Sequence, residues 1–514
     1  MSAIVFRVDA STAIGTGHVL RCRTLACALR EKGASVRFVT RAHSGHLGDL
    51  LAQDGFTVSM LQSGVNAQPD ADNHASWLGV GLEQDATETM DALAGEWCDW
   101  AIVDHYGLDR AWESRLRSCA RNIMVIDDLA DRAHDCDVLL DPNFADGGEA
   151  RYRARVPADC RLLLGPRYAL LRPEYAKYDA SRRRRAGPLK RVLLFMGGAD
   201  RGNVTSIAMS ALAESRFAHL ELDVVVGASS PHRDSVRAQA AKRPGTRVHS
   251  ALPHLAGLMA DADLAIGAGG GTTWERMCLG LPGIVISIAE NQRPGCNALA
   301  RAGLIRYLGD ASRVDASIVA AALDEAMSRP DEFRAMGAEA QGYVDGKGAE
   351  RVAEALMPTA DSDLALRRAT SGDVMTYYGW ANDPVVRANS IDSSPISLRS
   401  HLRWFDDRLK DPDCFLFVVE AGTLPVGQIR FDRASEGLRI NYSLDSLVRG
   451  RGWAKKVLDL GIRALRVAEP TQLNAVVKTG NPASAAAFIR AGFAEQATAG
   501  SMRRFTLRFP RVEH

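Results

Sequence analysis

Short apolar runs alternate with helix-like stretches over the first 300 residues, and this alternation limits the fold more than any other feature of the sequence. The first apolar run, residues 4–6, is followed by a glycine-containing turn and then by Val19, Leu20, Leu25 and Leu29 at helical spacing. The same order of strand, turn and helix recurs further along the chain. Such a pattern predicts parallel sheets that carry helices on both faces.

The length and the linkers predict three domains. A chain of 514 residues is too long for a single hydrophobic core. The arginine run 182–185, followed by Gly187 and Pro188, is typical of an exposed linker, and the composition changes again at 357–361. We therefore expect two doubly wound domains, residues 1–180 and 188–350, and a smaller third domain, residues 361–514.

Charge and cysteine usage exclude several classes of function. The formal net charge is +1, so no overall field attracts nucleic acid or an anionic membrane. The nine cysteines lack the spacing of a disulfide framework, and no apolar run reaches the length of a membrane span. The chain enters a predicted strand almost at once, without a signal segment. These features predict a cytoplasmic protein without nucleic-acid or membrane partners, and no metal-binding cluster is apparent.

The turn between the first strand and the first helix predicts a ligand site. Gly15 and Gly17 allow the backbone to turn tightly and to approach a ligand, and they bring His18 to the mouth of the crevice. Unpaired amides in the first helical turn favour an anionic ligand. A purely structural turn, in which His18 packs or caps, is the alternative.

Further candidate residues follow later strands of the first domain. One predicted strand ends in Asp104 and leads to His105 and Tyr106, and the next ends in Asp127 and Asp128. The carboxyl ends of parallel strands are where such sheets bind ligands. The three residues from Asp104 to Tyr106 fit either a ligand site or the cap of the next helix.

In the second domain, the sequence GAGGGTTWE at 267–275 carries the main argument for a bound diphosphate. Its consecutive glycines and two threonines at a predicted helix start expose amides and hydroxyls, and Glu275 lies one turn into the helix, where it suits ribose hydroxyls. No Walker lysine follows, which argues against transfer of a terminal phosphate. A loop selected only for tight packing is the alternative.

Collinear motifs across residues 1–350 resemble a known family. They are RVDAS-x-x-IGTGHVLR, VDHYGLD, LLDPNF, GPRYALLRPEY, FMGGAD, GAGGGTTWERMCLGLP and ENQ. In these motifs the chain is similar to the UDP-sugar hydrolases of pseudaminic acid biosynthesis, which have two facing Rossmann-like domains as in GT-B glycosyltransferases. The resemblance implies hydrolysis of UDP-2,4-diacetamido-2,4,6-trideoxy-β-L-altropyranose to UDP and the free sugar, with C–O cleavage and inversion.

The same resemblance implies roles for individual residues. His18 matches the catalytic base and Tyr106 matches a position near the sugar, so both are predicted to be catalytic. An ordinary imidazole is substantially neutral at cellular pH and can accept a proton from water. A UDP-sugar is the expected partner, and association with other enzymes of the pathway would fit. The predicted substrate-binding residues are Gly17, Arg21, Gly198, Gly270, Gly271, Thr272, Thr273, Glu275, Asn291 and Gln292.

Residues 361–510 resemble a second family. The pattern R-x-x-G-x-A at 449–454 and the segment NPASAAAFIRAGF at 481–493 are similar to the GCN5-related N-acetyltransferases (GNAT). WANDP at 380–384 and HLRWF at 401–405 resemble the branch that acetylates an amino sugar of the same pathway. The resemblance implies a mixed α/β domain that binds acetyl-CoA and acetylates a UDP-4-amino sugar. The predicted cofactor-binding residues are Arg449, Gly450, Arg451, Gly452, Trp453, Ala454 and Asn481.

One residue departs from this second family. Phe488 stands where many of these transferases carry a tyrosine that protonates the departing thiolate, and phenylalanine has no proton to donate. Water or another group must then serve, or the domain has lost activity, and spacing alone assigns no general base. For the first two domains, a GT-B glycosyltransferase and a non-catalytic nucleotide-sugar-binding protein stay open as alternatives.

Overall fold

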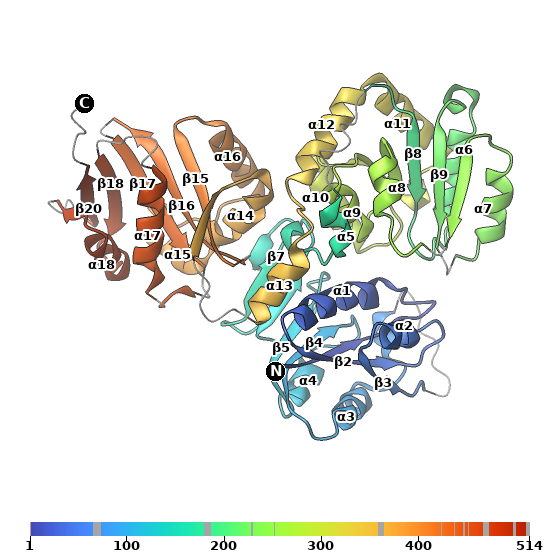
Figure 1. The fold of residues 1–514 in the computed structure, drawn as a ribbon, viewed down its shortest axis with the longest axis horizontal. Helices are drawn as coiled ribbons and strands as arrows, with labels where there is room; N and C mark the ends of the chain where they lie inside the picture. Colours follow the sequence, from blue (N-terminus) through green and yellow to red (C-terminus); the bar gives the residue numbers. More distant parts are fainter. Residues whose placement is uncertain are drawn as a thin grey trace. The chain divides into compact units, whose positions relative to one another are not determined.

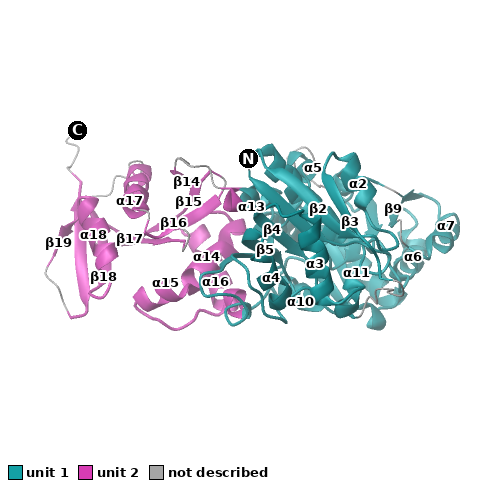
Figure 2. Ribbon diagram, turned by 90° about the horizontal axis from the view of Figure 1, so that it is seen from below, with its two compact units in different colours: residues 1–146, 151–353 teal, residues 147–150, 354–514 magenta. Residues whose placement is uncertain are grey.

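The computed structural model describes residues 2–64, 73–178, 187–227, 230–250, 252–357, 364–422, 424–435, 437–445, 448–450, 452–465, 472–496 and 500–509. These residues form three sheets (Figure 1). The chain divides into two compact units, residues 1–146 with 151–353 and residues 147–150 with 354–514 (Figure 2). The first unit holds two of the sheets and the second unit holds the third.

The first sheet is parallel, with the strand order β3-β2-β1-β4-β5-β6-β7. Because the order reverses between β1 and β4, the chain leaves these two neighbours in opposite directions, which opens a crevice at their carboxyl ends. The strands are β1 (Ala3–Val8), β2 (Ser35–Arg41), β3 (Thr57–Leu61), β4 (Cys98–Asp104), β5 (Ala120–Ile126), β6 (Val138–Asp141) and β7 (Arg161–Leu164). The helices are α1 (Gly17–Glu31), α2 (Gly48–Gln53), η1 (His74–Leu78), α3 (Leu82–Ala92), α4 (Arg110–Leu116) and α5 (Pro173–Lys177).

The second sheet is also parallel, with the order β10-β9-β8-β11-β12-β13 and a reversal between β8 and β11. The strands are β8 (Arg191–Phe195), β9 (Glu221–Val226), β10 (Thr246–Ser250), β11 (Leu264–Ala268), β12 (Gly283–Ser287) and β13 (Arg306–Asp310). The helices are α6 (Val204–Leu212), α7 (Arg233–Ala240), α8 (Ala256–Asp261), α9 (Thr272–Cys278), α10 (Gln292–Arg301), α11 (Ala316–Ser328) and α12 (Pro330–Gln341), and α13 (Gly348–Leu356) follows.

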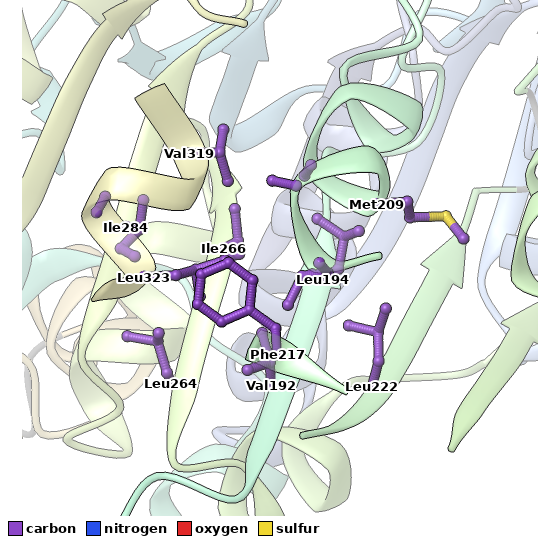
Figure 3. Close-up of a cluster of buried hydrophobic side chains, with 14 of the residues drawn as sticks. Val192, Leu194, Met209, Phe217, Leu222, Leu264, Ile266, Ile284, Val319 and Leu323 are labelled. Carbon is purple, nitrogen blue, oxygen red and sulfur yellow. The ribbon is translucent and has the colours of Figure 1, made fainter. Parts of the chain in front are cut away.

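The core of this second domain shows why the strand pattern folds as it does. Val192, Leu194 and Ile266 project from neighbouring parallel strands and meet Leu323 of α11 and Phe217, all essentially without solvent exposure (Figure 3). Strands that are covered on both faces need such nearly continuous apolar runs. The two parallel sheets confirm the predicted pair of Rossmann-like domains.

The loops at the carboxyl ends of the two sheets touch within the first unit. Nη2 of Arg201, in the loop after β8, donates to the carbonyl oxygens of Thr12 at 3.2 Å and Ala13 at 3.4 Å, in the loop after β1. At this point the two edges at which ligands bind in parallel sheets lie next to each other.

The third sheet is mixed, with the order β14-β15-β16-β17-β18-β20-β19. The β17–β18 pair is parallel and the other neighbours are antiparallel. The strands are β14 (Leu364–Arg368), β15 (Cys414–Ala421), β16 (Leu424–Ala434), β17 (Gly437–Leu444), β18 (Gln472–Lys478), β19 (Ala494–Glu495) and β20 (Met502–Arg508). The helices are α14 (Val374–Asn382), α15 (Pro384–Asn389), α16 (Leu398–Lys410), α17 (Trp453–Ala464) and α18 (Pro482–Arg490).

Some local expectations differ from the structure. The apolar pattern does not predict β3, β6, β7, β13, β18, β19 or β20, most of which have few consecutive apolar residues. Gly267 and Ala268, expected in the glycine loop, belong to β11. Helix α17 begins at Trp453 rather than at 449, because Gly452 has a left-handed φ of 75° and ends the preceding turn. The arginine run 182–185 lies outside the described residues.

Candidate active site

His18 and Asp104 lie at the switch point of the first sheet. His18 is the second residue of α1, and Asp104 is the last residue of β4, the neighbour of β1. Nδ1 of the imidazole lies 2.6 Å from Oδ1 of Asp104. Although burial opposes its charge, Arg21 and then His18 hold the pKa of Asp104 far below its ordinary value. A carboxylate can only accept, so Nδ1 carries the proton of this bond, and in the neutral ring Nε2 carries the lone pair.

Arg21 holds Asp104 from the other side. Its Nε donates to Oδ2 at 2.7 Å and its Nη2 to Oδ1 at 2.6 Å, a two-pronged contact that fixes the plane of the carboxylate. Nη1 of Arg21 lies 3.8 Å from Oδ2 of Asp128. Arg21, predicted to bind substrate, therefore directs its guanidinium toward two aspartates, of which Asp104 contacts His18.

Tyr106 restricts the imidazole by packing. Its ring stands edge-on to His18, with centroids 4.7 Å apart and an interplanar angle of 86°. Its hydroxyl donates to Oδ1 of Asp128 at 2.5 Å, and burial followed by Asp128 raises the pKa of Tyr106 well above its ordinary value. Trp77 stacks on Tyr106 with centroids 5.3 Å apart, and His74 lies 4.8 Å from both rings. The contact with Asp104 and the edge-on rings of Tyr106 and Trp77 thus restrict the orientation of His18.

A network of buried ion pairs lies at the carboxyl end of β1. Arg7 bridges Asp9 and Asp85, with contacts of 2.6 Å to each carboxylate, and Arg41 reaches Asp85 at 2.6 Å. All four side chains are buried. His105 points into this network, with Nε2 3.4 Å from Oδ2 of Asp9. Of the candidates at 104–106, His105 therefore supports the end of β1, whereas Asp104 and Tyr106 contact His18.

The glycine loop of the second domain lies between β11 and α9. A Cβ at Gly269 would overlap Sγ of Cys296, so close packing explains that glycine. At Gly271 a Cβ would meet nothing within 4 Å, and at Gly270 the nearest atom would be Nε2 of Gln292 at 3.6 Å. Packing therefore does not require glycine at these two positions, as expected if a ligand approaches the backbone there.

The threonines of this loop use their hydroxyls inside the protein. Thr273 is buried, and its Oγ1 accepts from Nη2 of Arg276 at 3.0 Å. Nη1 of Arg276 lies 3.5 Å from Oγ1 of the half-buried Thr272. The groups of this loop that remain for a ligand are chiefly backbone amides at the start of α9, a helix of seven residues.

Glu275 faces a tyrosine from the other domain of the same unit. Tyr175 of α5 shares a side-chain hydrogen bond with Glu275, and its hydroxyl oxygen accepts from the amide of Leu255 at 3.2 Å. Burial raises the pKa of Glu275 to about 7, although the bond from Tyr175 opposes the shift.

This shift predicts a pH-dependent contribution to stability. A carboxyl whose folded pKa exceeds its unfolded value of 4.5 stabilises the fold below that value and loses the contribution as pH rises toward 7. Relative to Glu275→Gln, the wild type should lose free energy of unfolding between pH 4.5 and 7, by up to about 1.4 kcal/mol per pH unit. Urea titrations of both proteins across this range measure the difference, and a constant difference would contradict the assignment.

The other predicted residues of the second domain lie on neighbouring loops. Gly198 lies in the loop after β8 and is exposed. Its backbone approaches Gly227 so closely that a Cβ on residue 227 would overlap Gly198. Asn291 is exposed just before α10. Gln292 begins α10, and its Oε1 accepts from the amide of Ile288 at 3.0 Å.

In the third domain, Arg449 ties two predicted motifs together. Its Nε donates to the carbonyl oxygen of Leu444 at 3.0 Å, and Nη2 lies 2.9 Å from Oδ1 of Asp383 in the WANDP segment. Trp380 of the same segment donates from Nε1 to Oδ2 of Asp445 at 2.8 Å. The WANDP segment therefore buttresses the loop that precedes α17.

The remaining predicted cofactor residues surround helix starts. Gly450 and Gly452 both have left-handed φ values, and Trp453 and Ala454 open α17. Asn481 caps α18, because its side chain accepts from the amide of Ser484 at 3.1 Å. Arg451 lies outside the described residues.

The strands β17 and β18 are paired at one end only. Their parallel register contains Leu438 with Leu473 and Arg439 with Asn474, and no further pair within the described residues. The rest of β17, residues 440–444, thus has backbone groups that β18 does not satisfy. An extended ligand with amide groups can bind such separated strands.

In the described ranges, no group of three or more His, Cys, Asp or Glu side chains is arranged to hold a metal ion. Among the described helices, none is both long and apolar enough to cross a bilayer.

Several residues of the first crevice were not assigned roles from sequence. The sequence shows Asp104 and Asp128 only as acidic residues at the ends of predicted strands. Their contacts with Arg21 depend on the order of strands in the sheet. Trp77 and His74 follow a stretch without a recognisable motif, so nothing in the sequence identifies them.

Known proteins match both the N-terminal part of the chain and its C-terminal domain. Residues 363–494 match the family model of the Acetyltransferase (GNAT) domain. An uncharacterized protein of Methanocaldococcus jannaschii is 22% identical over 467 residues, 85% of this chain and 86% of that protein. The spore coat polysaccharide biosynthesis protein SpsG of Bacillus subtilis is 27% identical over 220 residues, 42% of this chain and 64% of that protein.

A third relative carries the name expected from the motifs. The UDP-2,4-diacetamido-2,4,6-trideoxy-beta-L-altropyranose hydrolase of Campylobacter jejuni is 23% identical over 301 residues, 58% of this chain and 97% of that protein. Among solved structures, MurG of Acinetobacter baumannii matches with a TM-score of 0.49 at 15% identity, over 70% of this chain and 100% of that chain. These findings confirm the resemblance to the hydrolase and the presence of a GNAT domain.

Proposed function

We propose that the first two domains hydrolyse a UDP-sugar, with UDP-2,4-diacetamido-2,4,6-trideoxy-β-L-altropyranose as the substrate. The observation that carries this proposal is the bond between Nδ1 of His18 and Asp104, which directs a lone pair on Nε2 away from the aspartate. The similarity to the Campylobacter jejuni hydrolase over nearly its whole length supports the choice of substrate.

In this proposal His18 is the general base. Its Nε2 takes a proton from the water that attacks the anomeric carbon, and Asp104 stabilises the charge that forms on the imidazole. The bond from the anomeric carbon to the phosphate oxygen breaks, and attack from the opposite face inverts the anomeric configuration. Arg21 and Tyr106 keep the carboxylate and the ring in place, so little reorganisation is needed.

The second domain would hold the UDP group. Backbone amides around Gly270 and Gly271 can bind the diphosphate, and the leaving UDP is already a stable anion that needs no acid. Glu275 is proposed to contact the ribose hydroxyls. Gly17, Gly198, Asn291 and Gln292 complete the proposed substrate contacts, and Thr272 and Thr273 stabilise the loop through Arg276.

Product analysis tests the hydrolase proposal. When the full chain is incubated with the diacetamido UDP-sugar and no acceptor, free UDP and the free sugar should form. Proton and phosphorus NMR measure both products. Release of UDP only after a sugar acceptor is added would indicate a glycosyltransferase. Binding without any release would indicate a nucleotide-sugar-binding protein.

We further propose that the third domain, from about residue 361, transfers acetyl from acetyl-CoA to a UDP-4-amino sugar. The match of residues 363–494 to the GNAT family and the separation of β17 from β18 support this activity. The amides around Gly450, Gly452 and Trp453 would bind the pyrophosphate of CoA. The acetylated product would then be the substrate of the first two domains.

This second activity predicts an independent result. The full chain with acetyl-CoA and the UDP-4-amino sugar should release CoA thiol, measured with a thiol-reactive dye. The His18→Asn variant should release CoA at the wild-type rate, since that side chain lies in the other unit. No thiol release from folded wild type would contradict the acetyltransferase proposal and leave the hydrolase proposal unaffected.

A further inference from the structure

Tyr442 occupies the part of β17 from which β18 has separated. The last paired residue of β17 is Arg439, and Tyr442 follows three residues later. Its side chain packs against the core that residues of α17 and α18 also line. Tyr442 thus belongs to the part of β17 that β18 leaves unpaired, beside which the proposed acetyl-CoA would bind.

The hydroxyl of Tyr442 has a polar neighbour on α18. It lies 3.2 Å from Oγ of Ser484, in the first turn of that helix. Both residues are half-buried, so the pair is neither sealed in the core nor fully in solvent. Burial raises the pKa of Tyr442, which keeps the hydroxyl protonated near neutral pH.

Phe488 lies beside this pair but offers no proton. Its ring contacts Tyr442 with centroids 5.5 Å apart and also packs on Phe493 and Phe505 at 5.1 and 5.8 Å. It is 3% exposed. Tyr442 and Phe488 are therefore ring-to-ring neighbours in the core of the domain.

We propose that Tyr442 is the proton donor to the thiolate that leaves in acetyl transfer. The inference rests on the proposed acetyltransferase activity. The amine nitrogen attacks the thioester carbon, the N–C bond forms, and the C–S bond breaks with its electron pair on sulfur. Sulfur takes the proton of the Tyr442 hydroxyl, the phenolate regains one from water, and the substrate nitrogen releases its extra proton to water.

Three substitutions in the full chain test this assignment. Tyr442→Phe removes only the hydroxyl and should lower kcat for CoA release about 100-fold, while KM for acetyl-CoA changes less than about threefold. Ser484→Ala is the matched control, because it removes the same hydrogen bond but leaves the phenol, and it should keep kcat within about fivefold. Tyr442→Phe/Phe488→Tyr should regain most of the lost kcat.

The outcomes separate this inference from the activity on which it rests. A Tyr442→Phe variant with wild-type kcat would overturn the role of Tyr442 while the acetyltransferase stands. An equal loss in Ser484→Ala, or no rescue by tyrosine at 488 in a folded double variant, would also overturn it, because the hydrogen bond or the packing would then explain the loss. Absence of acetyl transfer by the wild type would overturn both proposals.

Discussion

The His18→Ala variant is expected to release UDP from the diacetamido UDP-sugar at least about 1,000-fold more slowly than the wild type. The substitution removes the Nε2 lone pair that is proposed to accept the proton of the attacking water. Because UDP is proposed to bind the second domain, the dissociation constant of UDP should change by less than about threefold. Initial rates of UDP release and calorimetric titration with UDP measure the two quantities.

A matched histidine outside the crevice controls for general effects. His219 is exposed in the second domain, so His219→Ala should keep the wild-type rate. Retained UDP release by His18→Ala would remove His18 from the mechanism. Loss of UDP binding in the same variant would instead place His18 in the nucleotide site.

The Asp104→Asn variant should lose about 10³–10⁴-fold in kcat. An asparagine can offer an N–H group to Nδ1, which would leave the proton on Nε2 and remove the lone pair from the reacting face of His18. Arg21 would also lose the charge of its partner. Asp91→Asn, at an exposed position on α3, is the matched control and should leave kcat unchanged.

A double variant shows whether Asp104 acts through His18. If it does, His18→Ala/Asp104→Asn should be no slower than His18→Ala alone, because the base is already absent. Multiplicative losses would indicate a separate function of Asp104. Thermal unfolding of each variant distinguishes a slow enzyme from an unfolded one, which matters because Asp104 is a buried partner of Arg21.

Much of the fold was predictable from the sequence, because apolar runs, glycine turns and helical spacing indicated the same elements. The apolar run of β1, the glycine turn and the helical spacing from Val19 predict strand, loop and helix, and the structure confirms them as β1 and α1. The strand-end position of Asp104 placed it at the ligand edge of a parallel sheet. The parallel sheets follow from this alternation, whereas the mixed third sheet was implied by the resemblance to the acetyltransferases.

The interactions within the site were not predictable, since they depend on which strands become neighbours. His18 and Asp104 are 86 positions apart and meet because β4 pairs with β1. The sequence does not decide whether Tyr106 faces a ligand or packs, because the stacking of Trp77 on Tyr106 depends on the fold. In the glycine loop, close packing against Cys296 explains Gly269, whereas no neighbouring atom requires glycine at position 271.

Hydrolysis in water enriched in oxygen-18 tests the central claim most directly. If water attacks the anomeric carbon with His18 as the base, the wild type should place the label in the sugar and release UDP without it, and early proton NMR spectra should show the inverted anomer. Mass spectrometry of the released nucleotide decides the point, because exchange at the free sugar does not alter UDP. Labelled UDP would mean attack at phosphorus and would contradict the mechanism.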